Sequence, residues 1–120
     1  MIAEVVRHLP EESCGLLAGC SGRVELVIPV ENQLHSRTGF RMEPSQQVKA
    51  FQEIEIRGLN LVGIYHSHPT GPAGPSQTDL DEFAYPGTVY LIWSPDGVGW
   101  QGRAFLLDAK ITQQISLIVE

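Results

Sequence analysis

Two short and almost continuously apolar segments, residues 59–66 and 88–94, constrain the fold of this chain more than any other feature. A strand with apolar side chains on both faces is typical of a sheet that is covered on both sides. Each segment is far shorter than the roughly 20 residues that a membrane-spanning helix requires. They therefore predict two inner strands of a covered sheet and oppose a helical membrane span.

Helical spacing of apolar residues predicts three helices. Residues 2–9 carry an apolar face that stops at Pro10, because proline disrupts a helix interior. Residues 44–58 form a second pattern, which begins with proline at the first helical position and ends at glycine. Its apolar face is expected to consist of Val48, Phe51 and Ile54. A third helix is expected from Ser76 to about residue 84, after the loop 70–75, which is rich in glycine and proline.

Shorter apolar runs bounded by turn residues predict the remaining strands. These lie at residues 15–19, 23–30 and 98–107, with turns at residues 21–22 and 95–97, and residues 111–119 favour a strand over a short helix. Strands that alternate with helices predict an α/β fold, in which helices cover a sheet. A chain of 120 residues suits one domain, residues 1–120.

The charge and the cysteine content narrow the classes of function. Lys and Arg number 8 and Asp and Glu 14, so the formal net charge is −6. Because nonspecific nucleic-acid binding depends mainly on Lys and Arg, no nucleic-acid partner is expected. Residues 1–10 lack the pattern of a signal peptide, and Cys14 and Cys20 are too few for a disulfide framework. We therefore expect a soluble, cytoplasmic protein with reduced thiols and no membrane partner.

The segment 63–69 (GIYHSHP), followed by Ser76 and Asp79, carries the most informative chemistry. Residues two apart on an extended chain project from the same face, so His66 and His68 can direct both imidazoles at one point. Asp79 lies in the first turn of the expected third helix, and the preceding loop is long enough to bring it back to the histidines. Two neutral imidazoles and one carboxylate are a common ligand set for catalytic zinc, with water in the fourth position.

A hydrolase built on such a site also needs a group that moves protons. Zinc lowers the pKa of a bound water to about 7. Glu12, just before the strand expected at 15–19, is the candidate to take the proton of that water and pass it to the leaving amine. Ser76 is the candidate to donate a hydrogen bond to the developing oxyanion.

These residues together resemble the signature of the JAMM (MPN-plus) metalloproteases. That signature is a glutamate, then His-Ser/Thr-His-Pro, then Ser-x-x-Asp after seven residues, and residues 12–19 (ESCGLLAG), 66–69 (HSHP) and 76–79 (SQTD) match it. The likeness covers most of the chain. Residues 29–32 resemble the family's Pro-x-x-Asn strand end, and residues 40–44 resemble its Phe-x-x-x-Pro helix entry.

The resemblance implies a three-layer MPN fold, related to that of the cytidine deaminases, in a small stand-alone prokaryotic form. It implies one zinc ion held by His66, His68 and Asp79, with Glu12 as general base and acid and Ser76 as oxyanion donor. Family members commonly cleave after the C-terminal Gly-Gly of ubiquitin or ubiquitin-like proteins. The small prokaryotic forms are associated with sulfur-carrier proteins, so we expect a partner with such a tail, which could add as a strand at a sheet edge.

Simpler interpretations stand beside each of these assignments. Ser76 begins an Ser-x-x-Asp helix start, so it could serve only as a helix cap. Glu11 competes with Glu12 for the role of base, and either could be a solvated loop charge. Cys14 fits a small buried residue better than a fourth ligand, which would close the site. His35 has no partner motif and is expected at the surface.

Three other functions compete with cleavage of a carrier-protein tail. A nucleoside deaminase is opposed, because the chain lacks His-x-Glu followed by Pro-Cys-x-x-Cys. A phage-tail or cell-wall peptidase of the same family would use the same zinc site on another amide bond. A catalytically silent MPN interaction module would be expected to lack one or more of the ligands, whereas all three are present.

Overall fold

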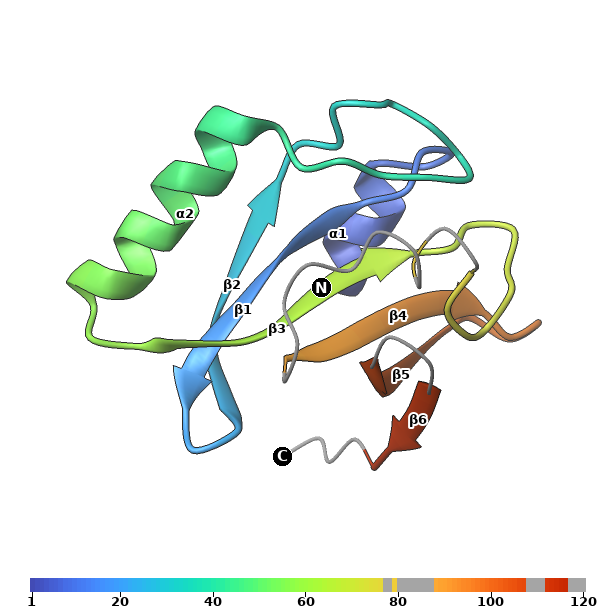
Figure 1. The fold of residues 1–120 in the computed structure, drawn as a ribbon. Helices are drawn as coiled ribbons and strands as arrows, with labels where there is room; N and C mark the ends of the chain where they lie inside the picture. Colours follow the sequence, from blue (N-terminus) through green and yellow to red (C-terminus); the bar gives the residue numbers. More distant parts are fainter. Residues whose placement is uncertain (77–78, 80–87, 108–111, 117–120) are drawn as a thin grey trace.

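In the computed structural model the chain forms a mixed sheet with helices on its faces (Figure 1). The structure describes residues 1–76, 79, 88–107 and 112–116. Within these residues the elements are, in chain order, α1 (Ile2–Arg7), β1 (Cys14–Cys20), β2 (Arg23–Val30), α2 (Pro44–Ile56), β3 (Asn60–Ser67), β4 (Val89–Pro95), β5 (Trp100–Leu107) and β6 (Thr112–Ile115). None of the helices in this part of the chain is long and apolar enough to cross a membrane.

The two apolar segments that opened the sequence form the inner strands β3 and β4. The order across the sheet is β2-β1-β3-β4-β5-β6. β3 and β4 run parallel, and every other neighbouring pair among the described strands is antiparallel. A parallel pair requires a long crossover, and residues 68–88 supply one. The prediction of two inner strands is confirmed, and the connection that follows β3 carries part of the candidate site.

The turn between β1 and β2 follows from its two residues. Ser21 and Gly22 both have positive φ, at 51° and 75°, as a two-residue hairpin turn of the favoured type requires. Cys20 pairs directly with Arg23 across this turn. The predicted hairpin is therefore confirmed.

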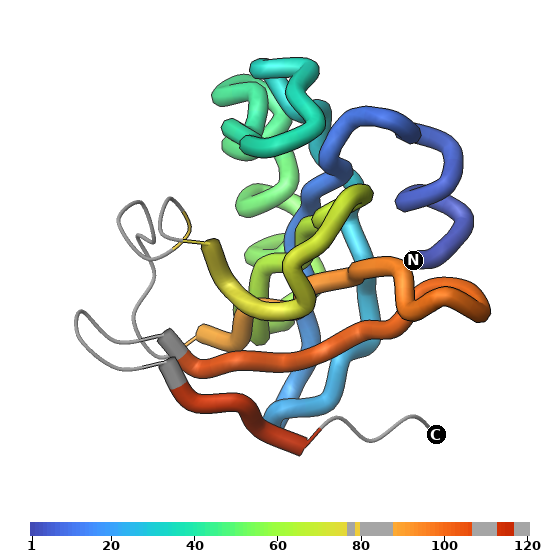
Figure 2. The backbone as a smooth tube through the Cα atoms, turned by 90° about the vertical axis from the view of Figure 1, so that its right-hand side faces the viewer, coloured from blue at the N-terminus to red at the C-terminus, as the bar shows by residue number. Residues whose placement is uncertain are grey.

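Alternation along the strands divides the core between the two faces of the sheet. Leu16 and Ile64 belong to a cluster that includes Ala50 and Ile54 of α2. Leu17 and Tyr65 belong to a second cluster, on the opposite face. Figure 2 shows α1 and α2 on opposite sides of the sheet, so the layers are helix, sheet and helix. The expected three-layer α/β fold, in which helices cover a sheet, is confirmed, and the sheet is mixed.

The apolar face of α2 differs from the expected one. Ala50 and Ile54 are buried, with Phe51 packed against the same cluster, whereas Val48 is 57% exposed. Six residues at about 100° each place Val48 about 120° around the helix from Ile54. The prediction of Val48 as a core residue is therefore wrong, because the sheet contacts a face that is centred nearer Ala50.

The predictions for the C-terminal half are confirmed in part. β5 begins at Trp100 rather than at residue 98, because Asp96 Oδ1 accepts from the backbone N–H of both Val98 and Gly99 and lengthens the turn. Residues 112–115 form the expected strand β6, while 111 and 117–119 lie outside the described residues. Asp79 is helical, and the rest of the third helix expected at 76–84 lies outside them, apart from Ser76.

Candidate metal centre

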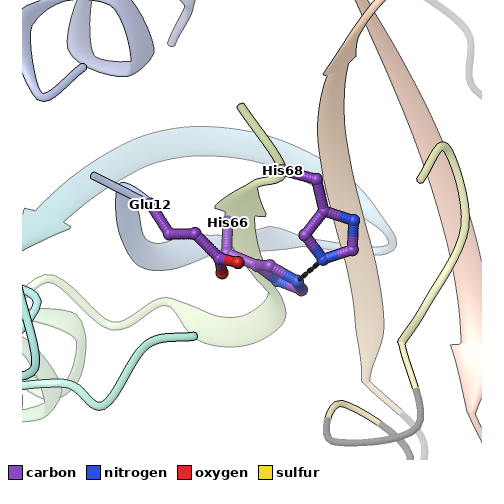
Figure 3. A group of neighbouring side chains, drawn as sticks. All are labelled: Glu12, His66 and His68. Carbon is purple, nitrogen blue, oxygen red and sulfur yellow. Dashed lines mark hydrogen bonds between the residues drawn. The ribbon is translucent and has the colours of Figure 1, made fainter. Parts of the chain in front are cut away.

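The end of β3 directs two imidazoles at one point. His66 and His68 lie two residues apart and their Nε2 atoms are 3.1 Å from each other (Figure 3). His66 is completely buried, on the side of the sheet that α2 covers, since it alternates with Tyr65. Asp79 Oδ2 lies 3.1 Å from the Nε2 atom of each histidine. Three ligand-type atoms from two separate segments therefore form a nearly equilateral triangle.

The donor set of this triangle fits a divalent metal ion. His68 Nδ1 donates to the carbonyl oxygen of Pro72 at 2.8 Å, which leaves a lone pair on Nε2 of the neutral ring. An ionised Asp79 can only accept, so Oδ2 and Nε2 of a neutral His68 repel each other at 3.1 Å unless a proton or a metal ion lies between them. Atoms bound to one zinc ion at tetrahedral angles lie about 3.3 Å apart. A shared cation would convert this repulsion into coordination.

The charges of the cluster follow from burial and from these contacts. Burial lowers the pKa of the His66 imidazole, and the neutral ring is the form that binds metal. Burial opposes ionisation of Asp79, but hydrogen bonds with His66 and His68 outweigh it and hold the pKa of this carboxyl far below its usual range. The Asp79 carboxylate is therefore an anion between two imidazoles.

Local sequence explains the orientation of Asp79. Its backbone N–H donates to Ser76 Oγ at 3.0 Å, while the backbone N–H of Ser76 donates to Asp79 Oδ2 at 2.9 Å. This is the reciprocal pattern of a helix capping box, so Ser76 does act as a cap. Because Ser76 Oγ accepts in this contact, its own hydroxyl hydrogen is not used in it.

Glu12 completes the cluster from the segment before β1. Its carboxylate points toward the histidines, and ligand-type atoms of Glu12, His66 and His68 all lie within 4.8 Å of one another (Figure 3). The residue is 3% exposed, and its Oε1 has no hydrogen-bond partner among the described residues. Burial raises the pKa of Glu12 to about 8, with His68 opposing and Asp79 adding to the rise. By contrast, Glu11 Oε2 contacts His35 Nδ1 at 3.1 Å, away from this group.

Cys14, two residues after Glu12, is a buried thiol. Its Sγ donates to the carbonyl oxygen of Val30 at 3.4 Å. Burial, followed by the nearby Glu12, raises the pKa of this thiol to about 12, so it does not supply a thiolate.

Sequence reasoning missed three residues that hold the cluster in place. Ser67 is fully buried between the two histidines, and its Oγ accepts from the backbone N–H of Ser13 at 2.8 Å. Phe40 stacks on the ring of His66 with centroids 4.6 Å apart. Asn32 donates to the carbonyl oxygen of Glu12 at 3.0 Å. Asn32 and Phe40 lie in the two segments marked by the family resemblance, which was the only signal for them.

The sheet order bears on how a substrate tail could bind. The outer strands of the described sheet are β2 and β6, whereas the histidines follow β3. β2 is separated from β3 by β1, and two strand spacings amount to about 10 Å. A tail that added at either outer edge would have to cross at least two strands to reach the histidines, and the edge at which a tail adds stays a prediction.

Comparisons with known proteins show which family the chain resembles. The sequence profile described as prokaryotic homologs of the JAB domain matches residues 1–107. The chain is 42% identical to the probable TtuB-protein conjugate cleaving protease of Thermus thermophilus, over 98% of this chain and 74% of that protein. It is 34% identical to the desampylase of Pyrococcus furiosus, over 99% and 84%. It is also 34% identical to the CysO-cysteine peptidase of Mycobacterium tuberculosis, over 100% and 85%.

Solved structures share the architecture. The solution structure of a protein from Desulfitobacterium hafniense superposes with a TM-score of 0.88 at 32% identity and covers 100% of this chain and 86% of that one. The crystal structure of a JAB1/MPN domain protein from Archaeoglobus fulgidus gives a TM-score of 0.61 at 19% identity, over 97% and 84%. The second likeness concerns the fold alone.

Proposed function

The chain belongs to the family of prokaryotic JAB-domain homologs, and on this premise we propose that it is a zinc-dependent peptidase of the JAMM type. Its reaction is hydrolysis of an amide bond at the C-terminal Gly-Gly tail of a ubiquitin-like or sulfur-carrier protein. The observation that carries this proposal is the convergence of His66, His68 and Asp79 within 3.1 Å, beside a Glu12 carboxylate whose Oε1 has no hydrogen-bond partner in the described part of the chain. The relatives named as a conjugate-cleaving protease and as a CysO-cysteine peptidase support the choice of substrate.

In this proposal one zinc ion is held by His66, His68 and Asp79. Bound there, zinc would lower the pKa of a water ligand to about 7 and polarise the scissile carbonyl. The hydrogen bond from His68 Nδ1 to Pro72 supports the role, because it sets the tautomer that presents Nε2 as a ligand. The capping box supports the role of Asp79 as a ligand, since the hydrogen bond from the backbone N–H of Ser76 orients Oδ2 toward the imidazoles.

Glu12 acts as the general base and then as the general acid. Its side chain is buried beside the ligands, and its Oε1, which has no partner among residues 1–76, 79, 88–107 and 112–116, can accept a proton from an attacking water. The raised pKa of about 8 shows how strongly burial favours the protonated form, and a neighbouring cation shifts this balance back toward the carboxylate. A carboxyl group that titrates near the working pH can both take the proton and return it to the leaving amine.

Ser76 donates its hydroxyl hydrogen to the oxyanion of the tetrahedral intermediate. The contact with Asp79 uses Ser76 Oγ as an acceptor, so capping and oxyanion stabilisation are compatible. Removal of one such donor costs about 100-fold to 1000-fold in kcat in other hydrolases.

Two free cysteines support a location in the reducing cytoplasm, where carrier proteins of this kind would be met. Cys14 and Cys20 are not joined by a disulfide.

The test compares two substrates with the purified protein after addition of one equivalent of zinc. One is a diglycine-tailed carrier joined through an amide to a fluorescent amine, and the other is a set of peptidoglycan fragments. We expect release of the amine from the carrier, loss of release after chelation, and recovery on return of zinc. Cleavage of the peptidoglycan fragments alone would favour the cell-wall peptidase, and a protein that takes up zinc but cleaves neither substrate would favour the interaction module.

A further inference from the structure

Asn32 is a buried side chain whose hydrogen-bonding capacity is completely used. It is 6% exposed and lies in the segment 31–42, between β2 and α2. Nδ2 donates to the carbonyl oxygens of Glu12 and Gly39, each at 3.0 Å. Oδ1 accepts from the backbone N–H of Leu34 and of Arg41, each at 3.1 Å. A side-chain amide has two donor hydrogens and two acceptor lone pairs, so all four are satisfied.

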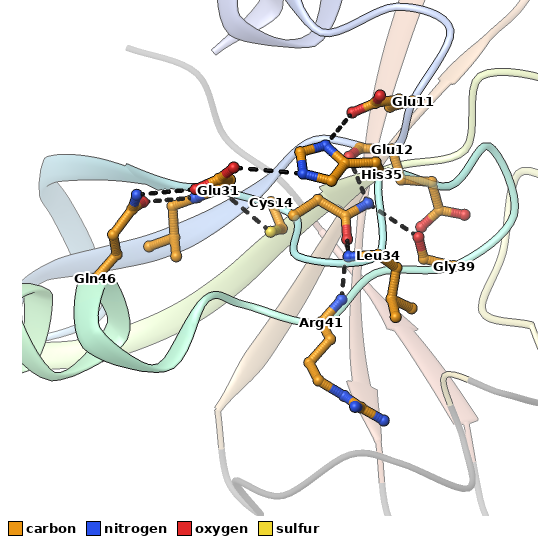
Figure 4. Close-up of polar contacts among 11 residues, drawn as sticks. Glu11, Glu12, Cys14, Glu31, Leu34, His35, Gly39, Arg41 and Gln46 are labelled. Atoms are coloured by element: carbon orange, nitrogen blue, oxygen red, sulfur yellow. Dashed lines mark hydrogen bonds and ion pairs between the residues drawn. The ribbon is translucent and has the colours of Figure 1, made fainter.

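The same segment makes hydrogen bonds with both backbone groups of Glu12, the N–H before its α-carbon and the carbonyl oxygen after it. The backbone N–H of Glu12 donates to the carbonyl oxygen of Ser36 at 2.7 Å, and its carbonyl oxygen accepts from Asn32. Figure 4 shows how Glu12, Gly39 and Arg41 lie around these contacts. Pairing of β1 with its neighbours in the sheet begins only at Cys14. The two hydrogen bonds of the Glu12 backbone itself therefore come from the loop, while the bonds of Ser13 to Ser67 hold the next residue to the end of β3.

Hydrogen bonds of the Glu12 carboxylate contribute little to its orientation. Its Oε1 has no hydrogen-bond partner among the residues that the structure describes. Its direction therefore depends on a fixed backbone. A catalytic group must stay within about 0.5 Å of its working position, and a displacement of about 1 Å can cost about 100-fold in rate.

We propose that Asn32 is a positioning residue for Glu12, one that fixes the backbone from which the base reaches the reacting water. The inference rests on the proposed function, because it takes Glu12 as the base. Asn32 is buried and its side-chain amide bonds only to backbone groups of the protein, so its role requires no contact with the substrate. Its effect on the reaction passes through the carbonyl oxygen of Glu12.

Other contacts fold the loop without touching Glu12, which makes the two roles separable. The backbone N–H of Gln33 donates to the carbonyl oxygen of Arg41 at 2.7 Å. Gln46 of α2 bonds to both the backbone and the carboxylate of Glu31, at 2.8 and 3.3 Å. A change at Gln46 removes two hydrogen bonds from the start of the loop and none from Glu12, so Gln46→Ala is the matched control.

The experiment is a double-mutant cycle on the zinc-loaded enzyme with the fluorescent carrier substrate. Asn32→Ala is expected to lower kcat by about 10-fold to 100-fold, with KM and zinc content close to those of the wild type, whereas Gln46→Ala keeps the wild-type kcat. In the Glu12→Gln background, Asn32→Ala is expected to cause no further loss, because the residue through which it acts is already disabled. The same fold-loss in both backgrounds, or an unchanged kcat in Asn32→Ala, would overturn the inference.

Asn32→Asp separates donation from acceptance if the alanine variant folds poorly. The carboxylate keeps an acceptor for Leu34 and Arg41 but cannot donate to Glu12, so kcat is expected to fall at least as far as in Asn32→Ala. A wild-type kcat in a folded Asn32→Asp protein would count against the inference.

A readout without turnover distinguishes this inference from the proposed function. Hydrogen exchange of the Glu12 amide is expected to speed up in Asn32→Ala and to stay slow in Gln46→Ala, with the amides of β1 and β3 protected in both. Retained protection in Asn32→Ala would overturn the positioning role alone, whereas a wild-type enzyme that cleaves nothing would count against the proposed function alone.

Discussion

Ser67 Oγ accepts a hydrogen bond from the backbone N–H of Ser13 at 2.8 Å, and the backbone N–H of Ser67 donates to the carbonyl oxygen of Ser13 at 3.0 Å. The residue between the two histidines is thus bonded to the residue after Glu12. One side-chain and one backbone hydrogen bond therefore join the strand that carries the ligands to the segment that carries the candidate base. Because side chains alternate along a strand, Ser67 projects from the face opposite to that of the two histidines.

This contact predicts a stability effect of Ser67. Ser67→Ala leaves the buried backbone N–H of Ser13 without its partner, so the free energy of unfolding is expected to fall by about 1–3 kcal/mol. Ser67→Thr keeps the hydroxyl and serves as the control. Urea unfolding of the metal-free proteins measures both. Equal stabilities of Ser67→Ala and wild type would show that the hydrogen bond contributes nothing net.

The ligand set predicts which changes remove the metal. His68→Ala takes away one of the three converging atoms and is expected to lose both zinc and turnover. Glu12→Ala is expected to keep one zinc per chain and to lose turnover. Because a ligand stabilises the folded state that binds it, added zinc should raise the Tm of wild type and Glu12→Ala but not of His68→Ala. Zinc content by elemental analysis and thermal melts check this, and turnover by a zinc-loaded Glu12→Ala protein would rule out Glu12 as the base.

The raised pKa of Glu12 predicts a pH dependence in the metal-free protein. Burial raises this pKa from 4.5 to about 8, so the folded state favours the neutral carboxyl. The stability contributed by Glu12 is therefore fully present below pH 4.5 and is lost as the pH rises toward 8. Glu12→Gln lacks this loss, so its advantage in free energy of unfolding over wild type should grow between these pH values. The histidines and Asp79 are common to both proteins, and a difference that stays constant with pH would contradict the prediction.

The capping box predicts how to separate the two roles of Ser76. Glycine is tolerated at a helix N-cap at a cost of a few tenths of a kcal/mol, whereas alanine costs about 1 kcal/mol. Ser76→Gly is therefore expected to keep most of the stability but to lower kcat by about 100-fold, since the hydroxyl donor is gone. Thermal melts and steady-state kinetics measure the two effects. Wild-type kcat in Ser76→Gly would leave Ser76 with the capping role only.

Local patterns account for the parts of the site that could be predicted. His66 and His68 share a face because side chains alternate along a strand, and this holds wherever the strand lies in the fold. Ser76 and Asp79 form a capping box because helix geometry brings residues three apart together. The apolar runs that form β3 and β4 also predicted inner strands locally, because apolar side chains on both faces of a strand require that both faces be covered.

Other features depended on packing between distant segments. Val48 satisfied helical spacing as well as Ala50 did, and only the position of the sheet decided which one is buried. The turn before β5 is an exception, because Asp96 lengthens it through local contacts with the backbone of Val98 and Gly99. The choice between Glu11 and Glu12 depended on which carboxylate enters the cluster and which contacts His35.

The sequence by itself determined the chemical types of the site and the elements that carry them, because periodicity and capping act over a few residues. Only the tertiary structure decided that Oδ2 of Asp79 meets both imidazoles and that Asn32 holds Glu12 from 20 residues away. Those contacts join segments with no fixed spacing along the chain, so their geometry arises from the packing of the loop and the strands against each other.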